Sequence, residues 1–334
     1  MHARIESRLI FIALPLFAAC SDERAPPTIA AEPQATATQP AAEQPTADAF
    51  QVETERFADL RLLRYRVPGF EELDLRDKRL LYYLYEAALS GRDMIYAQRY
   101  AYNLAIRRTL EKIVRDYPGS RDTDDFKALV IYTKRVWFSN GIHHHYANDK
   151  FVPGFSFDAF ARYVHETPGP FPTREGQSLD DFLAELRPIM FDPAVDAKLV
   201  DKRAGIDVVT ASAVNFYDGV TQAEVEAFYA ARKRPSDSTP VSYGLNSRLV
   251  RGADGAPIEQ VWKVGGLYTE AIERVVFWLE QAVTVAENDA EREALEKLIA
   301  FYRSGDLEDW DAYNGAWVAD SDSLGYAITG FLAV

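Results

Sequence analysis

Apolar side chains recur every three or four residues through the first half of the chain, the spacing of one buried face on an α-helix. Three groups show this pattern most clearly, and each predicts a helix that packs against others. The groups are Leu80, Leu81, Leu84 and Ala88; Ile106, Leu110 and Ile113; and Phe126, Leu129, Val130 and Trp137.

Two serines mark the starts of further helices. Ser156 precedes the apolar segment 157–164, and Ser178 precedes a similar segment at 179–186. A serine hydroxyl can accept a hydrogen bond from a free amide in the first turn, so both serines are predicted N-caps. We expect additional helices near 221–232, 267–287 and 289–303.

Residues 205–264 are richer in β-branched side chains and predict strands. The run 206–214 (IDVVTASAV) is one candidate, and the segments 241–250 and 257–264 flank Gly252-Ala253-Asp254-Gly255. An Asp-Gly pair between two apolar runs favours a β-hairpin, because both residues tolerate the positive φ of a tight turn. The predicted fold class is therefore α+β and helix-rich. No internal repeat or second linker interrupts residues 51–334, so we expect one lobe there.

The N-terminus has the pattern of an export signal. Arg4 and Arg8 precede an apolar run of eleven residues at 9–19, which is too short for a stable transmembrane helix. Leu16-Phe17-Ala18-Ala19-Cys20 resembles a bacterial lipobox, so we expect cleavage of a signal peptide at 1–19 and lipidation of Cys20. The alternative is an ordinary secretory signal with an incidental cysteine.

Residues 20–50 predict a disordered linker between the lipid and the lobe. Five prolines, nine alanines and one aromatic residue stand among residues 21–50, a composition that cannot bury much apolar surface. The expected location is that of an exported bacterial lipoprotein that faces the periplasm. Ser21 after the cysteine favours the outer over the inner membrane.

Composition and charge exclude two classes of protein. The 334 residues are 48% hydrophobic and 13% aromatic, which rules out a largely disordered chain. Lys and Arg number 37 against 51 Asp and Glu, giving a net charge of −14. Because binding to nucleic-acid phosphates needs Lys and Arg, no nucleic-acid partner is expected. A single cysteine also excludes a disulfide within the chain.

The five histidines limit where metal or acid–base chemistry could lie. His2 falls in the signal peptide, and His165-Glu166 begins as a zinc-protease helix would, but Pro168 and Pro170 follow and predict a helix end instead. In His143-His144-His145 an extended backbone would point His143 and His145 the same way. Packing of a polar loop is the favoured interpretation there, with a catalytic or metal role as the alternative.

Other catalytic motifs are incomplete. The stretch around Ser156, Gly154-Phe155-Ser156-Phe157-Asp158, lacks the second glycine of a nucleophile elbow. Gly265-Gly266 predicts a strand-to-helix turn rather than a phosphate-binding loop. Tyr243 and Asn246 could line a cleft, although packing in a strand is the favoured interpretation. No catalytic, metal-ligating or substrate-binding residue is assigned from these patterns.

Several long strings resemble the N-terminal portion of bacterial members of the dipeptidyl peptidase III family. They stand at 81–96 (LYYLYEAALSGRDMIY), 102–107 (YNLAIR), 137–146 (WFSNGIHHHY) and 242–247 (SYGLNS), and the resemblance extends over residues 52–320. It implies a zinc metallo-exopeptidase that releases dipeptides from the N-termini of short peptides. It also implies two lobes, one of them combining helices with a small β-barrel or antiparallel sheet.

The resemblance places zinc outside this chain. The family's ligands lie in H-E-x-x-G-H and E-E-x-R-A-[DE] helices, and neither motif occurs here. Where the family continues with Gly-Phe-Ile-Glu-x-Tyr, this chain reads Gly330-Phe331-Leu332-Ala333-Val334. We therefore expect residues 51–334 to be an incomplete N-terminal lobe that binds no zinc and is inactive as given. The alternatives are a non-catalytic peptide-binding or interaction lipoprotein, and a lobe that pairs with a separately encoded second one.

Overall fold

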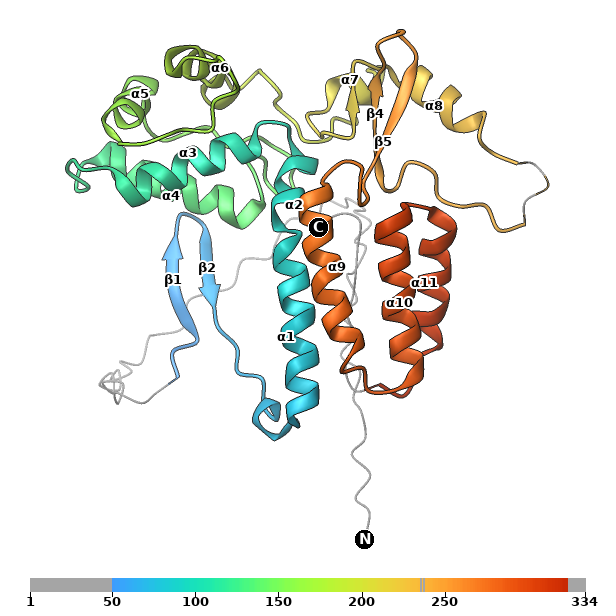
Figure 1. Cartoon of the computed structure of the whole chain (residues 1–334). Helices are drawn as coiled ribbons and strands as arrows, with labels where there is room; N and C mark the ends of the chain where they lie inside the picture. The colour runs from blue at the N-terminus through green and yellow to red at the C-terminus, as the bar shows by residue number, and fades with distance from the viewer. Residues whose placement is uncertain (1–49, 235, 237, 324–334) are drawn as a thin grey trace, which may run out of the picture. The chain divides into compact units, whose positions relative to one another are not determined.

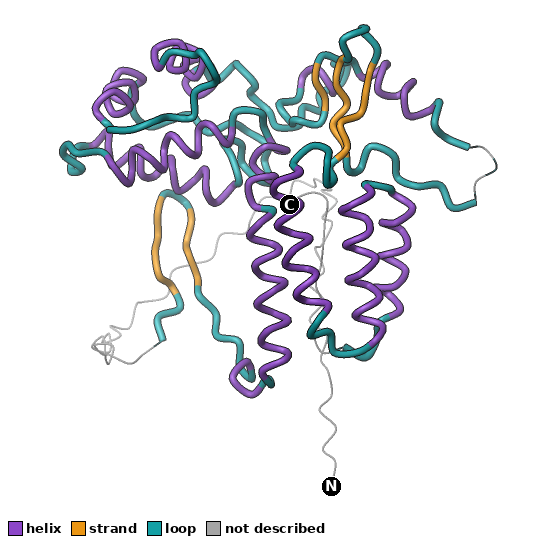
Figure 2. Tube along the Cα trace, viewed as in Figure 1, coloured by secondary structure: helices purple, strands orange, loops and turns teal. Residues whose placement is uncertain are grey.

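The computed structural model of the chain describes residues 50–234, 236 and 238–323. The predicted signal peptide, Cys20, the linker up to residue 49 and Gly330–Val334 lie outside these residues. Helices dominate the described part, and its strands form two small sheets (Figure 2). The predicted α+β, helix-rich class is confirmed. Within the described residues, no helix is both long and apolar enough to span a bilayer.

The first hydrophobic cluster is built mainly from the helices of residues 92–191. Ile106, Leu110 and Ile113 are fully buried in it, as their spacing predicts. The serine caps are also confirmed, because the Ser156 and Ser178 side chains accept hydrogen bonds from Ala159 N and Asp181 N. The helices are α2 (Arg92–Arg99), α3 (Asn103–Asp116), α4 (Asp124–Ser139), α5 (Phe157–Glu166) and α6 (Leu179–Phe191).

The second cluster joins helices that are distant in sequence. In it α1 (Leu75–Ser90) lies beside α9 (Thr269–Val283), and α10 (Asp289–Ser304) packs against α9 and α11 (Leu307–Ala319) (Figure 1). The predicted helices at 267–287 and 289–303 correspond to α9 and α10. Helix α11 was not predicted, since its sequence has little one-sided apolar pattern and only Tyr313 within it is fully buried.

On two helices, one side chain predicted to lie on the buried face is partly exposed instead. On α1 the buried stripe follows Leu80, with Ala87 two turns later, so Leu81 is 38% exposed. On α4 Trp137 is 41% exposed and donates from Nε1 to Glu111, whereas Val136 beside it is fully buried. One residue of helix turns a side chain by about 100°, which is enough to move it out of the core.

The two sheets of the described residues contain two and three strands. Strands β3 (Tyr217–Asp218) and β4 (Ser247–Arg251) pair in parallel, and β4 pairs antiparallel with β5 (Pro257–Val261). A separate hairpin joins β1 (Glu53–Phe57) to β2 (Leu60–Leu63). The described strands form no closed barrel.

The predicted hairpin at 252–255 is confirmed as the β4–β5 turn, with positive φ at Gly255. The prediction of a strand at 206–214 is wrong. The one-turn helix α7 (Val208–Ala211) forms there, because the Asp207 side chain accepts from the amides of Val209 and Thr210. Helix α8 (Gln222–Ala230) follows with a Thr221–Glu224 capping box, as predicted at 221–232.

Candidate functional site

His143 is a buried structural residue in the loop after α4. Its side chain is 1% exposed and its Nε2 donates to the carbonyl of Asp196 at 2.7 Å, while the ring meets Tyr100 edge-on at 5.2 Å. Burial lowers its pKa to about 4, an effect that Lys150 and Arg99 reinforce and the Asp196 carbonyl opposes. The imidazole is therefore neutral at pH 7 and carries its proton on Nε2.

His144 and His145 are stacked on each other rather than aligned with His143. Their ring centroids lie 4.7 Å apart with 11° between the planes. His144 Nδ1 accepts from the amides of Tyr146 and Ala147, each at 3.1 Å, and His145 Nδ1 lies 3.2 Å from Ser139 Oγ. The expectation that His143 and His145 point the same way is not met, because the chain turns here: Asn148 N donates to His144 O.

His165 and Glu166 end α5, as the following prolines predict. His165 Nε2 lies 3.2 Å from Asp180 Oδ1, and Glu166 accepts from the Tyr117 hydroxyl at 3.0 Å. Within the described ranges, no group of three His, Cys, Asp or Glu side chains could hold a metal ion. The contacts described for His143, His144, His145 and His165 are all with other residues of the fold.

Asn246 has a packing role at the start of β4. It is 4% exposed, and its side-chain amide donates to the Gly305 carbonyl at 2.9 Å, which ties β4 to the end of α10. Tyr243 is half-buried in the preceding turn rather than in a strand. The contacts of Asn246 favour the packing interpretation of that residue.

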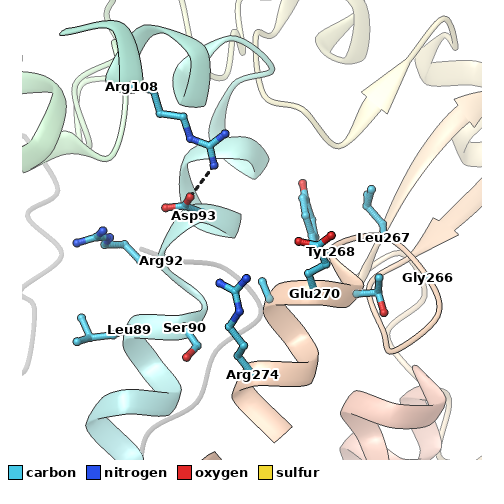
Figure 3. Close-up of a pocket in the computed structure, with 12 residues that line it drawn as sticks. Leu89, Ser90, Arg92, Asp93, Arg108, Gly266, Leu267, Tyr268, Glu270 and Arg274 are labelled. Atoms are coloured by element: carbon cyan, nitrogen blue, oxygen red, sulfur yellow. Dashed lines mark hydrogen bonds and ion pairs between the residues drawn. The ribbon is translucent and has the colours of Figure 1, made fainter. Parts of the chain in front are cut away.

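A pocket of about 680 Å³ lies where the α1–α2 junction faces the start of α9 (Figure 3). Leu89, Ser90, Arg92 and Asp93 line one side, with Arg108 of α3. The other side is formed by residues 266–271 and Arg274. We call this the α2–α9 pocket.

The turn before α9 shapes the second wall of the pocket. Gly265 has φ of 76°, as the predicted strand-to-helix turn requires, and its amide donates to Thr269 Oγ1 at 2.8 Å. Tyr268 also has a positive φ, 65°, which is unusual for a large residue. Its ring lies 6.1 Å from that of Trp262, and burial raises its pKa to about 12.

On the first wall, Asp93 and Arg108 form part of an ion-pair group, whereas Arg92 has no ion-pair partner among the described residues. Asp93 accepts from Arg107 at 2.8 Å and from Arg108 at 3.0 Å. Burial raises the pKa of Asp93, but the two guanidinium hydrogen bonds outweigh it and hold the pKa below its ordinary value. The carboxylate is therefore charged and paired at neutral pH.

On the second wall, Arg274 and Glu270 likewise have no ion-pair partner among the described residues. In Figure 3 the dashed line joins Arg108 to Asp93, and none reaches either of these side chains. Arg274 extends into the space between Asp93 and Glu270. The sequence-based interpretation missed this pocket. The only local signal is the four-residue spacing from Glu270 to Arg274, which many solvent-exposed helices share.

Comparison with known proteins supports the resemblance drawn from the sequence strings. Residues 251–333 match the sequence model of Peptidase family M49, so the matched segment includes α9 with Glu270 and Arg274. This agreement confirms the resemblance to the dipeptidyl peptidase III family. A search of curated proteins finds no match.

Two solved structures are similar to this chain. Dipeptidyl peptidase III from Caldithrix abyssi is 18% identical with a TM-score of 0.44, over 76% of this chain and 35% of that one. The enzyme from Corallococcus sp. strain EGB is 18% identical with a TM-score of 0.45, over 77% and 35%. The chain thus spans about a third of the length of the solved proteins it matches.

Proposed function

We propose that this chain takes part in a zinc-dependent exopeptidase activity of the dipeptidyl peptidase III type, as the part that handles short peptides rather than the part that holds zinc. The observation that carries this proposal is the family match over residues 251–333. The four strings at 81–247 extend the resemblance toward the N-terminus.

The described residues do not fit the zinc ion itself. A zinc ligand needs a free imidazole nitrogen or carboxylate, and catalytic sites gather three such groups. Within the described residues, no three such groups lie close enough together to hold one ion. We therefore derive no catalytic step through zinc for these residues.

Peptide binding by the full chain tests the proposal. Unlabelled tetrapeptides should bind saturably in calorimetric titration, and N-acetylated tetrapeptides should bind at least about tenfold more weakly, because an exopeptidase of this type recognises a free N-terminus. If no tetrapeptide binds, or if the acetylated forms bind as tightly as the unmodified ones, the proposal is refuted.

Hydrolysis of a dipeptidyl arylamide is measured in the same samples with and without added zinc. We expect none, since neither zinc motif occurs among the 334 residues. Zinc-dependent turnover would contradict the assignment of zinc binding to residues outside this chain.

We also propose that the N-terminus delivers the protein to a membrane surface as a lipoprotein that faces the periplasm. The lipobox-like sequence ending at Cys20 supports this. Acyl chains attached there would give stable membrane residence. In a bacterial host fed labelled palmitate, the full chain should become labelled and fractionate with the outer membrane. Cys20→Ser should be unlabelled, and labelling of this variant would contradict the proposal.

A further inference from the structure

Three of the charged side chains that line the α2–α9 pocket, those of Arg92, Glu270 and Arg274, have no ion-pair partner among the described residues. Asp93 is already balanced by Arg107 and Arg108. Arg92 lies on the opposite wall at the start of α2, whereas Arg274 and Glu270 share the first turns of α9. A ligand able to satisfy both must carry an anion and a cation.

The spacing of these two groups limits the size of that ligand. Residues four apart on a helix have Cβ atoms about 5–6 Å apart, close enough for a Glu and an Arg to pair directly. Here no nitrogen of Arg274 lies within ion-pair distance of Glu270, and Figure 3 shows Arg274 directed into the cavity. Two extended residues span at most about 7 Å. The charged ends of a dipeptide can therefore reach both side chains.

The rest of the cavity suits such a ligand. Leu89, Leu267 and the Tyr268 ring offer apolar surface to its side chains. A cavity of about 680 Å³ also leaves room for water beside the ligand.

We propose that the α2–α9 pocket binds a dipeptide in its zwitterionic form, with the carboxylate on Arg274 and the ammonium group on Glu270. This choice of ligand rests on the proposed function, whose product is a dipeptide. The site would allow the released product to remain bound to the protein.

Titration of the full chain with Ala-Ala at low ionic strength tests this site. Two derivatives, N-acetyl-Ala-Ala and Ala-Ala amide, each lack one charge. We expect saturable binding of Ala-Ala and at least about tenfold weaker binding of both derivatives, because each leaves one charged side chain without its partner.

Variants assign the two contacts. Arg274→Gln should weaken Ala-Ala binding at least about tenfold and abolish the discrimination against the amide. Glu270→Gln should abolish the discrimination against the acetylated form. Arg292→Gln is the matched control, because this partly exposed arginine of α10 pairs with Asp289 and does not line the pocket. Both pocket side chains are exposed, so equal thermal melting of all variants is expected.

Two results would overturn the inference: no saturable binding of Ala-Ala, or binding that neither pocket substitution changes. The proposed function is tested separately by tetrapeptides. If tetrapeptides bind through their N-terminus while substitution of Arg274 and Glu270 leaves the affinity for Ala-Ala unchanged, only the pocket assignment fails. If Ala-Ala depends on both residues while tetrapeptides do not bind, the proposed function fails and the dipeptide site stands.

Discussion

Asn103 organises the loop that carries the three histidines. Its side-chain amide donates to the carbonyls of Tyr96 and Asn140, and its Oδ1 accepts from Ile142 N at 3.1 Å. Gly141 lies directly against this amide, with φ of 147°. Helices α2 and α3 and the loop at 140–142 therefore meet around one buried side chain.

A Gly141→Ala substitution should destabilise the protein by about 3 kcal/mol, because the new Cβ would lie 2.1 Å from Asn103 Nδ2 and φ would be strained. Gly176→Ala is the control, since φ there is 75° but the Cβ meets open space. It should cost only about 1 kcal/mol. Urea unfolding compares the two, and equal losses would show that the Asn103 contact contributes nothing.

His143 should make stability depend on pH. Its pKa is about 4 in the folded protein and 6.5 ordinarily, so between these values the unfolded chain binds more protons. The free energy of unfolding should therefore fall as the pH is lowered from 6.5 toward 4, by up to about 3 kcal/mol. His143→Gln should remove this part of the slope in urea titrations at pH 6.5 and 4.5. His165→Gln, at a half-exposed position, should keep it. An unchanged slope in His143→Gln would assign it to other groups.

The role of a residue could be predicted from the sequence only where its immediate neighbours in the chain determine the local structure. The prolines after His165 already exclude a continued helix, so its structural role was foreseeable. The pairing of Asp93 with Arg107 and Arg108 was not, because it joins two helices whose packing no local pattern encodes. The same limit hid Arg274 and Glu270, whose significance depends on the facing wall of the pocket.

At the scale of elements, helix starts followed from local chemistry. A serine before an apolar run supplies an acceptor to the first-turn amides, and this requires no knowledge of tertiary contacts. The run at 206–214 shows the opposite case. Its β-branched residues favour a strand, but Asp207 also accepts from Gln222 N at 2.9 Å, and this contact across the chain helps to hold the segment beside α8.

Replacing Ser156 by alanine should destabilise the protein by about 1 kcal/mol, because the Ala159 amide would lose the acceptor that now lies 3.1 Å away. Chemical denaturation of the variant measures the loss. Ser242→Ala provides the comparison at an exposed position and should leave the midpoint within error. A Ser156 variant as stable as the Ser242 variant would mean that the cap is not needed.

At the scale of the described molecule, one short helix serves two hydrophobic clusters. Tyr96 of α2 is buried in the first cluster, and Met94 of the same helix packs against the second. Asn215 adds a link by donating to the carbonyls of Ala97 and Gln98. The sequence revealed the helices of both clusters but not this shared element, because the partners of α1 are almost two hundred residues away.

The two clusters should therefore unfold together. Leu110→Ala in the first cluster and Leu298→Ala in the second remove buried side chains, and each should cost about 2–5 kcal/mol. Calorimetry should show one transition in the parent, shifted to lower temperature as a whole in both variants. A separate low-temperature transition in only one variant would show that the clusters are independent.

The β1–β2 hairpin is attached differently, because none of its residues belongs to any of the three hydrophobic clusters. Lys134 of α4 pairs with Glu55 and lies over the Phe57 ring, while Arg135 donates to Asp59 at 2.6 Å. Attraction between such partly exposed charges is screened as the Debye length falls from about 10 Å in 0.1 M salt to about 3 Å in 1 M. In 1 M salt the hairpin should therefore detach from α4 while the helices stay folded. Limited trypsin digestion should then cut first at Arg56 and Arg61. The ionic strength of the surroundings thus determines how tightly the β1–β2 hairpin is held against α4.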